Sequence, residues 1–164
     1  MPDLAIKRLL QAKNNGFFLN ISGRVLVLGC AQPELLKVLN LSELIVCHPE
    51  KAIMRRAQDL NFCTLINKSK ITKLKLLRSV GASIVYITKS RKETLLNIAM
   101  AFSATNRKGS IIITGGKKEG IEYALGELKK IIEPYSFLSK AHGKIGLFKR
   151  PERIPEVIRN WKKQ

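Results

Sequence analysis

Residues 135–149 decide the fold, and they read Tyr135-Ser136-Phe137-Leu138-Ser139-Lys140-Ala141-His142-Gly143-Lys144-Ile145-Gly146-Leu147-Phe148-Lys149. The two ends of this stretch, Tyr135–Leu138 and Ile145–Lys149, are short apolar runs of the kind that form strands. Only Ser139–Lys144 separate them. A parallel return to the same sheet needs a crossover of roughly a dozen residues or more, so the stretch predicts an antiparallel pair of strands.

Upstream of this pair, short runs rich in β-branched residues alternate with segments of helical spacing. The predicted strands are Val25–Leu28, Leu44–Cys47, Phe62–Ile66, Ile84–Ile87 and Ile111–Thr114. A first helix is predicted at Leu4–Lys13, and five apolar stripes predict further helices: Leu35, Leu36 and Leu39; Ile53, Ala57 and Leu60; Leu74, Leu77 and Val80; Leu95, Ile98, Ala99 and Phe102; Ile121, Leu125, Leu128 and Ile132. This alternation indicates right-handed crossovers and a mostly parallel sheet with helices on both faces.

Five parallel strands followed by an antiparallel hairpin form the layout of the class I methyltransferases. The predicted fold is therefore α/β and class I methyltransferase-like (Rossmann-like), with a seven-stranded, mostly parallel sheet and a C-terminal antiparallel hairpin. Residues 1–164 are expected to form one domain. Pro151, Pro155 and Trp161 mark a tail of about residues 150–164, with a short helix from Glu156 to Lys162, that is expected to leave the compact body and lead toward a missing catalytic domain.

The composition points to a polyanionic partner. Thirty Lys and Arg against twelve Asp and Glu give a formal net charge of +18, which attracts nucleic acid. No apolar run approaches the roughly 20 residues of a membrane span, and the N-terminus lacks a signal-peptide pattern, so the expected location is the cytoplasm, with no membrane partner. Cys30, Cys47 and Cys63 are widely spaced and lie in apolar runs, so they are interpreted as buried small hydrophobes, with no metal site and no disulfide.

Ligands of such sheets bind beyond the carboxyl ends of the strands, and three loops there depart from a pattern that binds S-adenosylmethionine. The first strand ends in Gly29-Cys30-Ala31-Gln32-Pro33, which has a single glycine. The second ends in Cys47-His48-Pro49, where an acidic residue would hold the ribose. The fourth ends in Ile87-Thr88-Lys89-Ser90 in place of a catalytic Asn/Asp-Pro-Pro-aromatic turn. We therefore expect no catalytic residue, a degenerate turn at Gly29, Cys30 and Ala31, and no cofactor in this domain.

Basic residues occupy the loops instead. Topology places the ends of the fourth and fifth strands and the closing hairpin on one edge of the sheet, and helix N-termini expected at Ser90 and Lys117 would add positive dipole ends there. RNA contact is the functional interpretation, and a solvated rim on a generally basic protein is the alternative. The candidate RNA-binding residues are Lys89, Arg91, Lys92, Lys117, Lys118, Lys140, His142 and Lys144.

Two other features have ordinary structural explanations. The segment Lys68–Arg78 mixes basic and apolar positions, which suits either a sheet-covering helix with a lysine face or a helix that binds RNA or a membrane surface. His142 and His48 could titrate near neutral pH, but the sequence places no carboxylate or nucleophile beside them.

The stretch from Lys89 to Pro151 resembles the N-terminal half of the ribosomal RNA small-subunit methyltransferase C family, enzymes that methylate the exocyclic amine of a guanine in 16S rRNA. The resemblance rests on Lys92-Glu93 before the Leu95–Phe102 helix, on Gly109–Gly115 followed by Gly116-Lys117-Lys118-Glu119-Gly120-Ile121, and on Ser139–Lys144 before Leu147-Phe148. Gly23-Arg24-Val25-Leu26-Val27-Leu28-Gly29 also resembles the first strand of the family.

Members of that family are similar to two class I methyltransferase domains in tandem, a degenerate first copy and a catalytic second copy. The resemblance implies that this chain is the non-catalytic first copy, which assists binding of ribosomal RNA and the folding and docking of a catalytic methyltransferase domain in cis or in trans. S-adenosylmethionine is then expected only in the catalytic partner domain. Two alternatives remain: a divergent, stand-alone RNA methyltransferase that binds the cofactor at Gly29–Pro33, and a purely structural docking domain.

Overall fold

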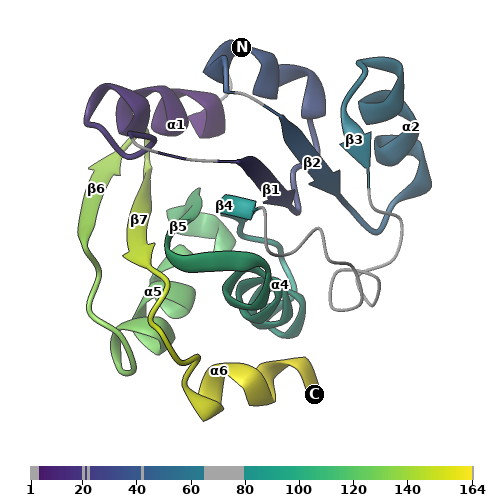
Figure 1. The fold of residues 1–164 in the computed structure, drawn as a ribbon. Helices are drawn as coiled ribbons and strands as arrows, with labels where there is room; N and C mark the ends of the chain where they lie inside the picture. Colours follow the sequence, from purple (N-terminus) through teal and green to yellow (C-terminus); the bar gives the residue numbers. More distant parts are fainter. Residues whose placement is uncertain (1–3, 20, 22, 42, 65–79, 164) are drawn as a thin grey trace.

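The fold of the chain is given by a computed structural model, which describes residues 4–19, 21, 23–41, 43–64 and 80–163. Seven strands form one sheet in the order β3-β2-β1-β4-β5-β7-β6 (Figure 1). The first five strands are parallel, β7 runs antiparallel to β5, and β6 runs antiparallel to β7. This arrangement confirms the predicted layout, including the closing hairpin.

The described residues form the following elements in chain order. The strands are β1 (Arg24–Leu28), β2 (Leu44–Cys47), β3 (Cys63–Thr64), β4 (Val80–Tyr86), β5 (Thr105–Gly116), β6 (Ser136–Lys140) and β7 (Gly143–Lys149). The helices are α1 (Leu4–Asn14), α2 (Lys51–Asp59), α4 (Arg91–Ala104), α5 (Ile121–Lys129) and α6 (Glu156–Asn160). The 3-10 helices in the described part of the chain are η1 (Pro33–Leu39), η3 (Lys117–Glu119) and η4 (Trp161–Lys163).

Alternate residues of the strands face two separate cores. Val25 and Val27 of β1 point into the core beneath α1, η1 and α2, whereas Leu26 and Leu28 point into the core beneath α4, α5 and the C-terminal helices. This division follows from the two-residue period of a strand. Figure 1 shows α1 on one side of the sheet and α4 and α5 on the other, as predicted.

One predicted helix position is wrong. Val80 was expected in the helical stripe with Leu74 and Leu77, but it is the first residue of β4, where it pairs with Arg24 of β1 and Thr105 of β5. The strand is buried at Val80–Val85, so its sequence shows no polar alternation that would distinguish it from a helix. The rest of that stripe, residues 65–66 of the third predicted strand and the segment Lys68–Arg78 lie outside the described residues.

Two other predicted helices differ from the structure, one in its type and one in its start. The stripe Leu35, Leu36 and Leu39 lies on the 3-10 helix η1, which has Pro33 at its start and ends at Asn40 in the left-handed region. Lys117 begins the short 3-10 helix η3, and α5 starts only at Ile121, after Gly120 with a φ of 98°. The start of α4 is as predicted, because the Ser90 hydroxyl accepts a hydrogen bond from the Glu93 N–H.

The C-terminal tail packs onto the domain instead of leaving it. Ile158 is fully buried and Trp161 is 6% exposed, and both belong to the core on the α4 side of the sheet. Ile154, Ile158 and Trp161 have helical spacing, so α6 and η4 present one apolar face to α4. The prolines at 151 and 155 turn the chain back before this helix begins, and α6 lies beside α4 in Figure 1.

The cysteines are not all buried. Cys30 and Cys47 are buried as predicted, but Cys63 is exposed because it lies on β3, the edge strand of the sheet. Among the described residues, no group of three or more His, Cys, Asp or Glu side chains could hold a metal ion. Within the same part of the chain, none of the helices combines the length and the apolar content that crossing a bilayer requires.

Candidate nucleic-acid interface

One edge of the sheet collects the loops that carry the candidate residues. We call it the carboxyl edge, because β1, β2, β4 and β5 end there and β7 begins there. Gly116 at the end of β5 pairs with Gly143 at the start of β7, and the Lys117 N–H donates to the His142 carbonyl at 3.0 Å. The register therefore brings the loop after β5 and the β6–β7 turn into direct contact.

The first group of candidate residues lies at the start of α4. Lys89, Arg91 and Lys92 are all exposed. The Arg91 guanidinium lies over the ring of Tyr123 in α5, 4.2 Å from its centroid. This contact connects the start of α4 to α5. Lys89 and Lys92 form no ion pair with the other described residues.

The second group is Lys117 and Lys118 in η3, and both are exposed. Their helical turn is fixed by Glu119, whose Oε1 accepts a 2.6 Å hydrogen bond from the Gly116 N–H. The same oxygen lies 3.8 Å from the Arg8 Nη2. Glu119 is thus held against its own turn by this hydrogen bond, although its side chain, like Lys117 and Lys118, is exposed.

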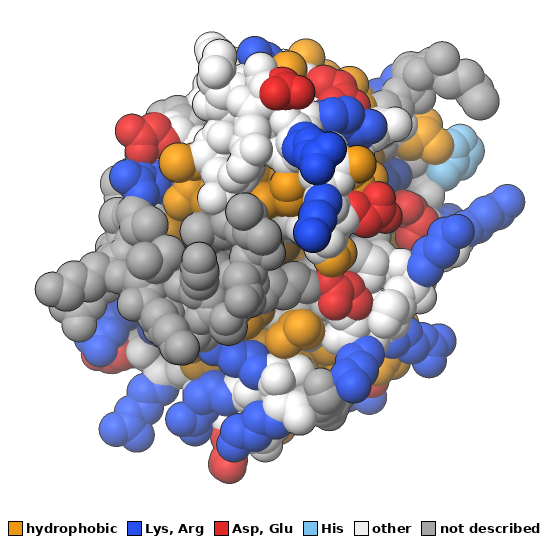
Figure 2. All heavy atoms as spheres, turned by 90° about the vertical axis from the view of Figure 1, so that its right-hand side faces the viewer, with side chains coloured by type: hydrophobic (Ala, Val, Ile, Leu, Met, Phe, Trp, Pro, Cys, Tyr) orange, Lys and Arg blue, Asp and Glu red, His pale blue; other side chains and the backbone are white. Residues whose placement is uncertain are grey.

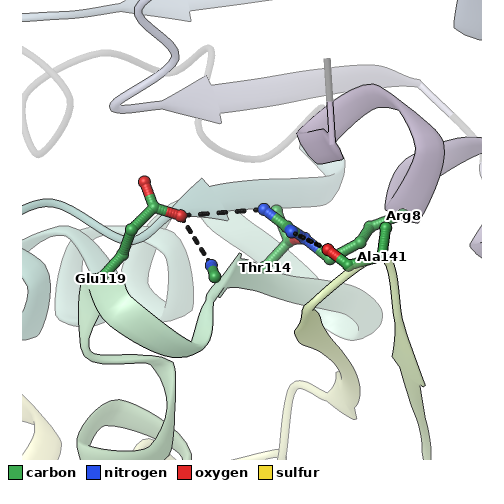
Figure 3. A network of polar contacts seen from close by, with 5 residues as sticks. Arg8, Thr114, Glu119 and Ala141 are labelled. Atoms are coloured by element: carbon green, nitrogen blue, oxygen red, sulfur yellow. Dashed lines mark hydrogen bonds and ion pairs between the residues drawn. The ribbon is translucent and has the colours of Figure 1, made fainter. Parts of the chain in front are cut away.

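A buried arginine that the sequence analysis did not single out supports this edge. Arg8 of α1 is only 3% exposed, donates from Nε to the Thr114 hydroxyl at 3.3 Å and donates from Nη1 to the Ala141 carbonyl at 3.0 Å. Figure 3 shows the guanidinium reaching from α1 to these groups and toward Glu119. Arg8 therefore joins α1, the end of β5 and the β6–β7 turn. The available signal was its position beside Leu9 and one turn before Ala12, on the apolar face of the predicted first helix.

The third group lies in and beside the β6–β7 turn. Ala141 and His142 have φ values of 49° and 55°, so the predicted six-residue loop is a tight two-residue turn. Lys140 and His142 are exposed. Lys144 is half-buried, and its ammonium lies 2.7 Å from Glu122, which lowers the pKa of that carboxyl through the hydrogen bond and the charge of Lys144. Lys144 is thus the one candidate cation that an acid neutralises in the described part of the chain.

A groove of about 1270 Å³ lies beside these groups at the carboxyl ends of β1, β4 and β5. It is the place where ligands bind in sheets of this order. Its walls come from the start of α1, the loop after β1 and the turn after β5. The lining residues that bear charge or could bear it are Arg8, Glu34, Lys117, Lys118, Glu119 and His142.

The loops that would hold S-adenosylmethionine direct their polar atoms at their own backbone. Gly29 has a φ of 81°, and a Cβ there would lie 3.0 Å from the Tyr86 carbonyl, so the glycine serves the close approach of β1 and β4. His48 is 9% exposed, and its Nδ1 accepts from the Glu50 N–H at the start of α2. The Thr94 hydroxyl accepts from the Thr88 N–H at 3.1 Å and holds the loop after β4. The end of β2 offers no carboxylate for a ribose.

Asn97 of α4 lies beneath the Gly29 turn. Its Nδ2 would be 3.6 Å from a Cβ at Gly29, and the side chain is fully buried. Within the described residues, neither its Oδ1 nor its Nδ2 has a hydrogen-bond partner. A buried amide in this state costs about 1–3 kcal/mol, so the polar groups beneath the Gly29 turn are less well satisfied than those of Arg8 at the end of β5.

The strand order, the antiparallel closing strand and the groove at the carboxyl ends define a class I methyltransferase-like domain. The chain belongs to the family described as Methyltransferase small domain N-terminal, whose family model matches residues 18–143. No match was found among curated proteins.

Solved structures show the same fold at low sequence identity. The 16S rRNA methyltransferase RsmC of T. thermophilus is 12% identical with a TM-score of 0.70, and the match covers 93% of this chain and 40% of that one. The N-methyltransferase NodS of Bradyrhizobium japonicum is 12% identical with a TM-score of 0.68, over 93% of this chain and 100% of that one. The tRNA methyltransferase TrmI of Aquifex aeolicus is 12% identical with a TM-score of 0.68, over 93% and 77%. This chain thus spans less than half the length of RsmC.

Proposed function

We propose that the chain is a non-catalytic, RNA-binding domain of an S-adenosylmethionine-dependent 16S rRNA guanine-N2 methyltransferase. In this role it contacts ribosomal RNA through the carboxyl edge and assists the folding and docking of a catalytic methyltransferase domain, in cis or in trans. The family and the likeness to RsmC support the assignment to rRNA methylation.

The observation that carries the RNA-binding proposal is the convergence of exposed cations at one edge. The pairing of Gly116 with Gly143 sets Lys117 and Lys118 beside Lys140 and His142, and the α4 start adds Lys89 and Lys92. On the face shown in Figure 2, Lys and Arg side chains lie both near the middle and along the lower margin, in keeping with the net charge of +18. Cations that neutralise phosphates release condensed counterions, so affinity should fall steeply with salt.

Charge reversal tests this edge. The double substitution Lys117→Glu and Lys118→Glu should weaken binding of a 16S rRNA fragment and reduce the slope of log affinity against log salt by roughly 2. The matched control is Lys37→Glu with Lys108→Glu, which makes the same change in net charge with exposed lysines of η1 and β5 near the amino ends of the strands. Equal losses in both variants would assign binding to overall charge and reject the edge.

We also propose that this domain holds no S-adenosylmethionine and contributes no catalytic group. The support is that His48, and not a carboxylate, directly follows β2, and that Thr88, Thr94 and His48 hold their own loops. The groove of about 1270 Å³ favours the alternative of a divergent methyltransferase. Calorimetric titration with S-adenosylmethionine decides between them, because saturable binding would require assay of the chain as an enzyme.

The docking role has its own test. Exposed large apolar side chains occur on several elements and do not mark one site by themselves: Leu4, Leu10, Leu19, Val38, Tyr135, Phe137 and Val157. A catalytic methyltransferase domain refolded with and without this chain should recover more activity in its presence. Equal recovery, together with no association in gel filtration, would leave RNA contact as the only function of the domain.

A further inference from the structure

Two aromatic rings are exposed on the outer strand of the sheet. Tyr135 is 71% exposed and Phe137 is 42% exposed, and the other aromatic side chains of the described residues are buried or half-buried. Phe137 lies in β6, the last strand in the sheet order, and Tyr135 directly precedes that strand. In Figure 1, β6 and β7 form the margin of the molecule on the side away from α2.

Lysines surround both rings. The Lys129 ammonium lies 4.6 Å from the centroid of Phe137, and the Lys144 ammonium lies 5.6 Å from it. The Lys149 ammonium lies 5.2 Å from the centroid of Tyr135. We call Tyr135, Phe137 and these three lysines the aromatic strip.

The strand pairing leaves Phe137 without a side chain opposite. Its partner in β7 is Gly146, where a Cβ would come within 3.1 Å of the Leu125 side chain and 3.2 Å of the Phe148 ring. Gly146 therefore permits close packing of α5 and β7, and Phe137 stays outside that packing at the margin of the sheet.

We infer that Tyr135 and Phe137 stack on unpaired bases of single-stranded RNA, with an RNA phosphate meeting the exposed ammonium of Lys129. This inference rests on the proposed RNA-binding function and adds the type of RNA and the mode of contact. Every base has a flat face that can stack on an aromatic ring, whereas the bases of a duplex already stack on one another. A docking surface for another protein would be expected to surround such rings with apolar side chains, and here ammonium groups surround them.

The test compares single-stranded and duplex RNA of equal phosphate number by fluorescence anisotropy. The double substitution Tyr135→Leu and Phe137→Leu keeps apolar surface and removes the rings. It should weaken single-strand binding roughly fivefold or more per ring, and leave duplex affinity and the salt slope unchanged. The matched control, Tyr135→Phe with Phe137→Tyr, should bind single-stranded RNA as the original chain does. Unchanged thermal unfolding of both variants establishes that they are folded.

A second readout detects the contact directly. A Tyr135→Trp variant should lose tryptophan fluorescence when single-stranded RNA is added, and the buried Trp161 should contribute a constant background. Wild-type affinity of the leucine variant would overturn the inference and leave the carboxyl edge untouched. Loss of only the association with a catalytic domain would assign the strip to protein docking instead. If the unsubstituted chain binds no RNA, the proposed function and this inference both fail.

Discussion

The two halves of the carboxyl edge differ in what their polar and charged side chains contact. At the ends of β1, β2 and β4, the polar groups of Thr94 and His48 bind the local backbone, and Gly29 serves strand packing. At the end of β5 and the start of β7, Arg8 is buried and donates to the Ala141 carbonyl, Glu119 accepts from the Gly116 N–H, and the neighbouring lysines are exposed. The comparison teaches that one part of the carboxyl edge can direct polar side chains at its own backbone while another part of the same edge presents exposed lysines.

We call the part of the carboxyl edge at the end of β5 and the start of β7 the basic half. The largest expected effect on stability comes from a substitution at Gly143, which is closely surrounded there. A Gly143→Ala Cβ would collide with the Gly115 carbonyl and lie 2.7 Å from the Arg8 Nη1. We expect a loss of about 3 kcal/mol in the free energy of unfolding, because the neighbours are backbone and a fixed guanidinium. Urea denaturation measures it. The control is Gly126→Ala in α5, which has open space and should gain up to about 1 kcal/mol.

Arg8→Met should separate α1 from the basic half. The Ala141 carbonyl and the Thr114 hydroxyl would lose a donor, at a cost of about 2 kcal/mol in unfolding free energy. Amide exchange at Lys117, whose N–H donates across the edge to His142, should become faster. Lys7→Met on the exposed side of the same helix should change neither quantity. Unaltered exchange at Lys117 in Arg8→Met would show that the arginine does not hold the edge.

Asn97→Leu, in the other half of the edge at the ends of β1, β2 and β4, should stabilise the fold. The substitution replaces a fully buried amide, which lacks a partner among the described residues, with an apolar side chain of similar size. We expect a gain of about 1 kcal/mol in thermal or urea unfolding. A loss of stability would indicate that the amide has a bound partner, and it would reopen the question of a ligand beneath the Gly29 turn.

The smallest effect concerns the titration of Glu122. The hydrogen bond from Lys144 holds the pKa of this carboxyl below its ordinary value of 4.5. Since the folded-state pKa is lowered, the pair stabilises the fold at pH values above the ordinary pKa and loses that contribution as the pH falls through the folded one. Lys144→Met should raise the pKa of Glu122 in an NMR titration, with little change in stability because the carboxylate is exposed. An unmoved pKa would contradict the pairing.

Much of the fold could be predicted from local patterns. The short apolar runs predicted the strands, and the short segment between the last two strands predicted that they are antiparallel. Val80 was assigned to a helix because a strand covered on both faces has no polar alternation. The tail was expected to leave the domain because of its prolines, but Trp161 packs in the core on the α4 side of the sheet. These errors come from tertiary packing, which the spacing of residues along a chain does not contain.

The candidate site divides in the same way. Topology alone brought the basic loops to one edge, and the structure places them there. Arg8 could not be assigned, because its partners lie more than 100 positions away and a single arginine on a helix is usually solvated. The exposure of Tyr135 and Phe137 was equally hidden, since an apolar run that predicts a strand does not say whether that strand will lie at the margin.

The bond from Arg8 to the Ala141 carbonyl has a consequence for the order of events during synthesis. It joins positions 133 apart, so a ribosome must have released almost the whole domain before the bond can form. Contacts of such separation are slow and come late, after the loop between them has been closed at an entropic cost. The proposed RNA-binding edge therefore depends on a contact that only a nearly complete domain can make, and a shorter nascent chain carries its positive charges without that contact.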